Sequence, residues 1–172
     1  IEIATLAPSA HNIQPWKFVV VREKNKELAK LAYGTNFDQV SEAPVTIVLF
    51  SDTDLPKRAR KIARIGGAKN FSEEQLQYFL KNLPAEYTRY NEQQISDYLA
   101  LNAGLVAMNL VLALTDQGIG SNIILGFDKS KVNEVLDIDA RFRPELLITV
   151  GYTDKKLEPS YRLPVDEIIE KR

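Results

Sequence analysis

An uncharged stretch between Asp97 and Asp116 constrains the fold of this chain more than any other feature, because it contains no Lys, Arg, Asp or Glu. It lies within a helical pattern that runs from Glu92 to Gln117. A membrane span needs about 20 apolar residues. This stretch is slightly shorter, contains Asn102 and Asn109, and lacks basic flanks. The sequence therefore predicts a helix buried in protein rather than in a membrane, apolar nearly all round and covered on every side.

The small residues of this helix suggest what covers it. Ala100, Ala103, Gly104 and Ala107 would form a face that another helix can approach closely. Burial in the chain's own core is the simpler alternative, but a chain of 172 residues offers few layers that could enclose such a helix. We expect a second copy of the chain to cover this face, and hence a homodimer with the long buried helix at its interface.

Length and composition exclude several classes of function. The length of 172 residues predicts one domain over residues 1–172. With 22 basic and 23 acidic residues, no net charge would attract nucleic acid or an anionic membrane, and neither is expected as a partner. The absence of cysteine excludes thiolate metal sites and agrees with a cytoplasmic location. His11 is the only histidine, so no multi-histidine metal centre can form, and we expect no metal.

Three strongly apolar segments, 17–22, 44–50 and 145–152, predict buried strands separated by helical patterns. This order predicts an α+β fold with a central mixed or antiparallel sheet flanked by helices. Residues 35–42 are interpreted as a polar connection, and residues 121–127 as the segment that leads from the long helix to the next one. The glycines at 118 and 120 follow a helix rather than a strand, which argues against a dinucleotide-binding turn.

Residues 52–90 are the least informative part of the chain, and we expect a helical flap over the core there. The basic run 57–61 is interpreted as a solvated helix face, because no aromatic platform for nucleic acid accompanies it. Ser72 and Gln75 have the spacing of a capping box, which places a helix start in this segment.

The candidate binding segment is the loop between Ala7 and Trp16. Pro8 and Pro15 restrict its backbone at both ends. Four polar residues lie between them: Ser9, His11, Asn12 and Gln14. A stiffened loop of this composition can present hydroxyl and amide groups to a flat polar ligand with little ordering cost. The alternative is an ordinary polar helix-to-strand loop whose Pro-Trp pair packs the start of the strand.

The string Pro-Ser-Ala-His-Asn-Ile-Gln-Pro-Trp-Lys-Phe, residues 8–18, resembles the flavin-contacting loop of the FMN-dependent nitroreductase family. A Pro-Ser-x-x-Asn-x-Gln-Pro-Trp run recurs in that family. The resemblance covers nearly the whole chain, although residues 52–90 are generic. It continues through Asn102-Ala103-Gly104, Met108-Asn109-Leu110, Gly126-Phe127-Asp128 and Arg162-Leu163-Pro164.

The resemblance implies FMN, held tightly and non-covalently at the dimer interface, with NAD(P)H as a transient co-substrate. The loop would contact the flavin of the partner subunit, and the N–H of Leu125 would point at flavin N5. Gln39 stands where the family often has lysine, which would lower the flavin reduction potential. The FMN-binding residues that the resemblance implies are Pro8, Ser9, Ala10, Asn12 and Gln14 in the loop, Asn36 and Gln39 at the pyrimidine edge, Ile123, Ile124, Leu125 and Gly126 against the ring system, and Arg162 at the phosphate.

The same resemblance implies an NAD(P)H-dependent FMN oxidoreductase. Hydride would pass from NAD(P)H to flavin N5 and then to a nitroaromatic, quinone or similar small electron-poor acceptor in a ping-pong cycle. No side chain is assigned as a catalytic acid or base, because no carboxylate pair stands in an apolar context and the cofactor would supply the chemistry. The alternatives are a non-catalytic flavin-binding protein on the same scaffold, or a related flavin-dependent dehalogenase or flavin-fragmenting enzyme. The family's basic N-terminal segment, a phosphate anchor, would lie before Ile1, and we expect such a segment in the natural protein.

Overall fold

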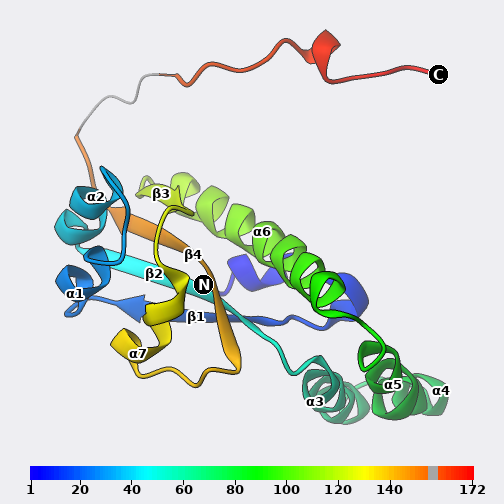
Figure 1. Cartoon of the computed structure of the whole chain (residues 1–172). Coiled ribbons are helices and arrows are strands. Elements are labelled where there is room, and N and C mark those ends of the chain that lie inside the picture. Colours follow the sequence, from blue (N-terminus) through cyan, green and yellow to red (C-terminus); the bar gives the residue numbers. More distant parts are fainter. Residues whose placement is uncertain (155–158) are drawn as a thin grey trace.

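An antiparallel four-stranded sheet lies at the centre of the computed structural model, which describes residues 1–154 and 159–172 (Figure 1). The strand order is β1-β2-β4-β3, and every neighbouring pair is antiparallel. The strands are β1 (Trp16–Val21), β2 (Val45–Asp52), β3 (Gly120–Ile124) and β4 (Phe142–Gly151). The fold is therefore α+β, as the sequence predicted, and the alternative of a mixed sheet does not apply.

β3 was missed by the sequence prediction, which assigned residues 121–127 to a connection. It is a short edge strand that pairs with β4 alone. Most of its side chains are exposed or half-buried, and Ile124 is its one buried residue. An edge strand of this kind lacks the continuous apolar run that marks the central strands β2 and β4.

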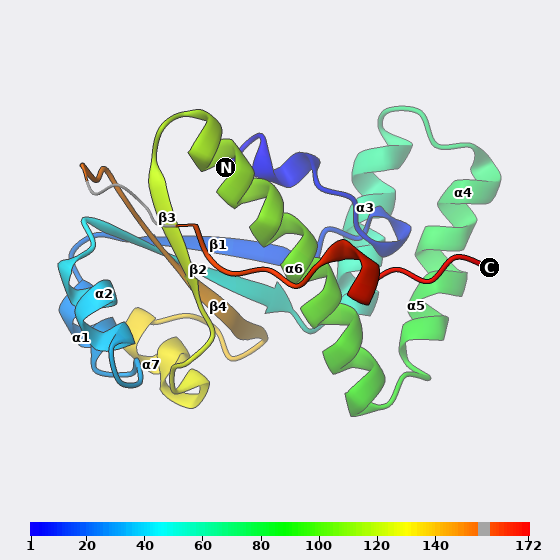
Figure 2. The ribbon, with the colours of Figure 1, turned by 90° about the horizontal axis from the view of Figure 1, so that it is seen from above.

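α6 (Glu92–Asp116) covers one face of the sheet, with the short turn η1 (Ala4–Leu6) beside it (Figure 2). Alternate residues of the central strands point toward this helix, among them Leu49 and Ile148, and they meet Val106 and Leu110 of α6. By length and composition alone α6 could cross a membrane. One side of α6 packs on the sheet, as predicted for a helix buried in protein, but its outer side is not covered by this chain.

Three short helices cover the opposite face: α1 (Asn25–Ala29), α2 (Asn36–Glu42) and α7 (Val132–Leu136). Val48, Phe50 and Leu147 point toward them from the sheet. The interpretation of residues 35–42 as a polar connection was wrong, because α2 occupies nearly all of that segment. Val40 is the only buried residue of α2, so its sequence carries almost no helical periodicity.

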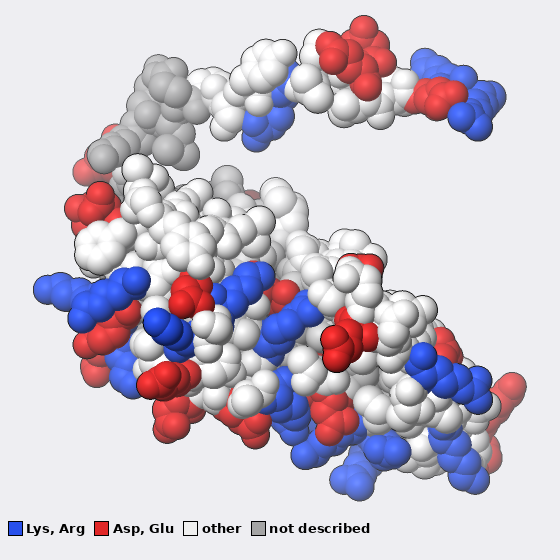
Figure 3. Space-filling model, viewed as in Figure 1, with Lys and Arg blue, Asp and Glu red and all other residues white. Residues whose placement is uncertain are grey.

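Helices are present in residues 52–90, as predicted; this segment, called the flap below, lies beside the sheet and contributes to a separate cluster of buried residues (Figure 1). It consists of α3 (Leu55–Gly67), α4 (Glu73–Gln77), a π-helical turn at Tyr78–Asn82 and α5 (Leu83–Tyr87). The Ser72–Gln75 capping box starts α4 as predicted. Basic and acidic side chains are interspersed over the lower part of the molecule in Figure 3, whereas the upper surface of the body, over α6 and β3, is mostly white. The basic run 57–61 is not entirely solvated, because Arg58 turns inward and contacts the loop before β1.

Two further features of the backbone matter for the site: the turn at Gly118 and the C-terminal residues 159–172. Gly118 has a positive φ of 70°, which lets the chain reverse between α6 and β3. Residues 159–172 form an exposed arm that is separated from the sheet and helices (Figure 1). The arm contains one short turn, Val165–Glu167, and five exposed large hydrophobic side chains. These are Tyr161, Leu163, Val165, Ile168 and Ile169.

Candidate functional site

The loop before β1 has an unusual backbone. His11, Asn12 and Gln14 all have positive φ, of 54°, 48° and 48°. The left-handed region costs a non-glycine residue roughly 1–2 kcal/mol, with asparagine among the more tolerant. Such strain persists only where the surroundings fix the backbone, and it concentrates at functional sites. The two prolines predicted a stiff loop, but this conformation could not be predicted from the sequence.

Two side chains of α6 hold the loop at a single residue, Ala10. The Ala10 N–H donates to Oδ1 of Asn102 at 3.0 Å, and the hydroxyl of Tyr98 donates to the Ala10 carbonyl at 2.9 Å. Asn102 is 1% exposed, and its Nδ2 donates to the carbonyl of Tyr98, so its orientation is fixed. Tyr98 and Asn102 are four residues apart and therefore lie on the same side of the helix.

The other end of the loop is held by Arg58 of α3. Its Nε donates to the Ile13 carbonyl at 3.2 Å, and its Nη2 donates to the Gln14 carbonyl. Burial lowers the pKa of the Arg58 guanidinium, and nearby Asp52 opposes that shift. Within the loop, the hydroxyl of Ser9 accepts the Gln14 N–H at 3.0 Å. Two helices and one internal contact therefore restrain a strained backbone.

The loop directs polar groups outward. Pro8, Ala10 and Asn12 are exposed, and Ser9 and Gln14 are half-buried. The Gln14 side chain folds back and donates to the Asn12 carbonyl at 3.1 Å. The structure therefore brings together the five residues that the sequence proposed for this part of the site.

An aromatic cluster lies behind the loop. The hydroxyls of Tyr87 and Tyr98 are 2.8 Å apart, and Nδ1 of His11 lies 3.3 Å from the Tyr87 hydroxyl. Burial raises the pKa of Tyr98 to about 12, although its hydrogen bond to Tyr87 acts in the opposite direction. Burial also raises the pKa of Tyr87. Both hydroxyls are therefore protonated at neutral pH and available as hydrogen-bond donors.

Sequence reasoning did not single out Tyr98 or Arg58 as site residues. Tyr98 was counted only as part of the uncharged stretch, and Arg58 only as part of a solvated basic run. The available signal was the spacing of four residues between Tyr98 and Asn102, which puts two polar side chains on one side of an otherwise apolar helix.

A second group of proposed residues surrounds the end of β3. Nδ2 of Asn36 donates to the Gly126 carbonyl at 3.1 Å, and a Cβ at Gly126 would lie only 2.7 Å from that nitrogen. Oε1 of Gln39 accepts from Nδ2 of Asn122. A cavity of about 630 Å³ adjoins this group and includes Gln39 and Asn122 in its wall.

The β3 residues themselves divide into two sets. Ile123 and Leu125 expose 38% and 66% of their surface, whereas Ile124 exposes 2% and packs in the core between the sheet and the short helices. The side chain of Ile124 is therefore not available to a ligand. The exposed apolar side chains of Ile123 and Leu125 suit the face of an aromatic ring system.

The two groups do not meet within one chain. In Figures 1 and 2 the loop before β1 lies beside α3 and α6, whereas α2 and the end of β3 lie at the opposite end of the molecule. Arg162 belongs to neither group, because it lies on the exposed arm, where its Nη1 donates to the Tyr161 carbonyl.

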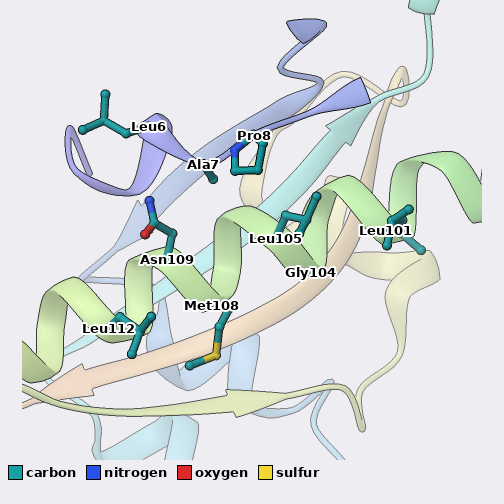
Figure 4. Close-up of a pocket in the computed structure, with 10 residues that line it drawn as sticks. Leu6, Ala7, Pro8, Leu101, Gly104, Leu105, Met108, Asn109 and Leu112 are labelled. Atoms are coloured by element: carbon teal, nitrogen blue, oxygen red, sulfur yellow. The ribbon is translucent and has the colours of Figure 1, made fainter. Parts of the chain in front are cut away.

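The outer side of α6 is apolar and exposed (Figure 4). Leu101, Met108 and Leu112 expose 68%, 49% and 56% of their surface and, with Leu6 and Pro8, line a groove of about 530 Å³. The predicted small-residue face is split. Ala103 and Ala107 pack against the chain's own sheet, whereas Ala100 and Gly104 face outward. Among the described residues, apart from the neighbours of Gly104 and the backbone of its own helix, no atom lies within 4 Å of a Cβ added at Gly104.

Metal chemistry has no visible candidate. In the parts of the chain that the structure describes, no group of three or more His, Cys, Asp or Glu residues could hold a metal ion. The donors at the candidate site are instead amides, hydroxyls and backbone N–H groups, which suit a polar organic ligand.

The fold and these groups define an α+β protein with a polar loop and an apolar strand end suited to an aromatic cofactor. Comparison with known proteins narrows this class to one protein family. Residues 1–152 match the model of the nitroreductase family. The chain is 65% identical, over its full length and 86% of the other protein, to the Streptococcus pyogenes protein named "Putative NAD(P)H nitroreductase Spy0809". This chain belongs to the nitroreductase family.

Two solved structures support the assignment. A nitroreductase family protein from Streptococcus pneumoniae TIGR4 superposes with a TM-score of 0.96 at 89% identity, covering 99% of this chain and 86% of that one. A structure from Exiguobacterium sibiricum, described as a "putative nitroreductase in complex with FMN", has a TM-score of 0.89 at 29% identity and covers 99% of this chain and 83% of its own. The family resemblance inferred from the loop is confirmed, and the comparisons support an oxidoreductase.

Proposed function

We propose that this chain is an FMN-dependent oxidoreductase that takes hydride from NAD(P)H and reduces nitroaromatic, quinone or similar electron-poor acceptors in a ping-pong cycle. The observation that carries the proposal is the loop before β1, whose strained backbone is fixed from two helices while Asn12 stays exposed. The relative that was solved with FMN adds support from outside the chain.

The residues present fit FMN by their chemistry. Amides and hydroxyls at Ser9, Asn12 and Asn36 can pair with the polar edge of a flavin, and Ile123 and Leu125 offer apolar surface to its ring. Gly126 leaves room for the Asn36 amide, because a Cβ at position 126 would lie too close to that amide. The proposed set is completed by Pro8, Ala10, Gln14, Gln39, the backbone of Ile124, and Arg162.

The chain's own residues bind and orient rather than react. FMN, when bound, supplies the hydride chemistry that no side chain of the protein can provide. The loop would fix the position of the flavin through groups whose ordering cost is met on folding. Arg162, as a planar fork of donors, suits the phosphate. We assign no catalytic acid or base.

We further propose that the protein acts as a homodimer in the cytoplasm, where NAD(P)H is available. The two halves of the candidate site lie at opposite ends of one chain, so a second copy is needed to join them (Figures 1 and 2). The apolar outer side of α6 offers a surface for that copy, and Gly104 would permit close approach.

Absorption spectroscopy tests the function. The purified protein, incubated with FMN and passed through a desalting column, should retain visible flavin absorption, and NADH or NADPH under argon should bleach it. Adding a quinone or a nitroaromatic should then restore the colour. Retained flavin that neither nucleotide bleaches would instead indicate a non-catalytic flavin-binding protein. Failure to retain or bind FMN would contradict the proposal altogether.

Sedimentation tests the dimer. Gly104→Glu would place an unpaired charge in the buried interface at a cost of several kcal/mol, so it should convert dimer to monomer. Ala140→Glu adds the same charge at an exposed turn away from α6 and should leave the dimer intact. A wild-type protein that sediments as a folded monomer at micromolar concentration would refute the proposal.

A further inference from the structure

The hydroxyl of Tyr98 occupies a junction between the flap and the candidate flavin loop. It donates to the Ala10 carbonyl at 2.9 Å and lies 2.8 Å from the hydroxyl of Tyr87, which belongs to α5 of the flap. A phenol has a single proton to donate. Because the proton of Tyr98 goes to Ala10, the hydroxyl of Tyr87 donates to Tyr98.

The same argument extends one residue further. Tyr87 gives its proton to Tyr98 and can therefore only accept from His11, whose Nδ1 lies 3.3 Å away. The hydrogen bonds thus run in one direction, from His11 through Tyr87 and Tyr98 to the Ala10 carbonyl. The chain of donors begins and ends in the loop, and it passes through the flap and α6 on the way.

Ala10 is the residue at which this chain of hydrogen bonds can control the loop. It precedes His11, the first of the residues with positive φ. Its carbonyl also accepts the Ile13 N–H at 3.1 Å, a contact that spans His11 and Asn12. A fixed Ala10 carbonyl therefore holds one end of the strained segment, while Arg58 holds the other end at the Ile13 and Gln14 carbonyls.

We propose that Tyr98 is a positioning residue of this site: its hydroxyl, oriented by Tyr87 of the flap, holds the Ala10 carbonyl and thereby keeps the loop in the conformation that receives the flavin. The flavin part of the proposal rests on the proposed function, whereas the loop part does not. Removal of the hydroxyl leaves Asn102, Arg58 and Ser9 in place, so the protein folds but the loop opens more often.

Tyr98→Phe is the direct test, and Tyr90→Phe is its matched control. Tyr90 belongs to the same aromatic cluster, with its ring 6.2 Å from that of Tyr98, but its hydroxyl donates to Glu86. Amide hydrogen exchange of the FMN-free protein reports on the loop through three hydrogen-bonded amides. These are the N–H groups of Asn12, Ile13 and Gln14.

Loss of one hydrogen bond should speed exchange at these amides about two- to tenfold and weaken FMN binding by a similar factor in Tyr98→Phe. Exchange in β2 and β4 should not change, and Tyr90→Phe should match the wild type in both measurements. Tyr87→Phe keeps the Tyr98 hydroxyl in place and should affect the loop less than Tyr98→Phe does.

Three results would overturn the proposal. The first is loop exchange in Tyr98→Phe equal to that in Tyr90→Phe. The second is faster exchange throughout the sheet to the same degree, which would indicate a general structural role. The third is loop exchange in Tyr87→Phe equal to that of the wild type, which would show that Tyr87 does not orient the Tyr98 hydroxyl. A wild-type protein that binds no FMN would contradict the proposed function instead, and the exchange result would still decide the role of Tyr98 in the loop.

Discussion

At the scale of single residues, the loop before β1 shows how much local sequence can and cannot specify. Pro8 and Pro15 predicted a restricted backbone. The left-handed conformations at His11, Asn12 and Gln14 depend on partners far along the chain, at Tyr98, Asn102 and Arg58. No local rule foresees contacts of that range, so the sequence predicted a stiff loop but not its conformation.

Asn12 allows the side chain and the backbone to be tested separately. Asn12→Gly removes the amide and adopts the φ of 48° without strain, so unfolding free energy should change by less than about 1 kcal/mol. Asn12→Leu removes the amide and adds left-handed strain, and it should also be less stable by roughly 1–2 kcal/mol. Both variants should bind FMN about tenfold more weakly, because flavin polar groups lose a partner.

Urea unfolding and fluorescence titration with FMN measure the two effects of these substitutions. Wild-type affinity for FMN in Asn12→Gly would mean that the asparagine serves only the conformation of the loop. That result would remove Asn12 from the proposed binding set.

The raised pKa of Tyr98, about 12, predicts alkaline sensitivity. An unfolded tyrosine has a pKa of about 10, so above that pH the folded state binds more protons than the unfolded state. The stabilisation from this group is complete below about pH 10 and is lost as the pH rises toward 12. The unfolding free energy of the wild type should therefore fall between pH 9.5 and 11.5, as measured by urea unfolding.

Tyr98→Phe should flatten that decline, since it removes one of the groups that cause it. Tyr161→Phe, at an exposed position on the arm, should retain the wild-type pH dependence. Equal slopes in Tyr98→Phe and the wild type would show that ionisation of Tyr98 is not linked to unfolding.

At the scale of elements, the sequence predicted those with strong periodicity or long apolar runs. The strands that became β1, β2 and β4, the flap and α6 were all anticipated. α2 and β3 were not, because each buries a single residue, Val40 and Ile124 respectively. α2, β3 and the two residues after β3 contain the second group of candidate site residues. Their position is fixed by tertiary contacts, such as that between Asn36 and Gly126.

The contact between α2 and the segment after β3 should depend on the missing side chain of Gly126. Gly126→Ala places a Cβ where the Asn36 amide lies, at 2.7 Å, so the amide must move and its hydrogen bond to the Gly126 carbonyl is lost. We expect a destabilisation of about 0.5–1.5 kcal/mol from the lost hydrogen bond, because the displaced amide is the end of a flexible side chain. In an Asn36→Ala background the obstacle is gone, and the same substitution should cost clearly less.

Unfolding free energies of the two single variants and the double variant give the coupling directly. Additive effects would show that the Cβ does not meet Asn36, and that α2 is held against the β3 end by other contacts.

At the scale of the whole molecule, the features that one chain leaves incomplete share an explanation. The apolar outer side of α6 is exposed (Figure 4). The loop before β1 lies far from the end of β3, and the C-terminal arm is separated from the sheet and helices (Figure 1). The uncharged stretch in the sequence predicted a partner for α6. Which surfaces that partner joins depends on the arrangement of two copies, and sequence patterns within one chain carry no information on it.

Mixed dimers test whether each site takes its loop from one subunit and its strand end from the other. Asn12→Leu removes a proposed FMN contact of the loop, and Gly126→Ala displaces the proposed contact at the Asn36 amide, so each variant alone should hold FMN more weakly than the wild type. If the two variants exchange subunits, each mixed dimer contains one site with both defects and one site with neither. Random mixing should then restore about a quarter of the wild-type FMN sites, because half of the dimers are mixed and half of their sites are intact.

The measurement is the amount of tightly bound FMN after the two purified variants are mixed, partly unfolded and refolded together. Each variant refolded alone is the control, because every site in such a sample keeps its defect. Recovery in the Asn12→Leu and Gly126→Ala mixture alone would establish a site shared between subunits. If that mixture retains no more FMN than its components, while sedimentation shows mixed dimers, both halves of the site must come from one chain, and the loop could reach the flavin only by a rearrangement of that chain.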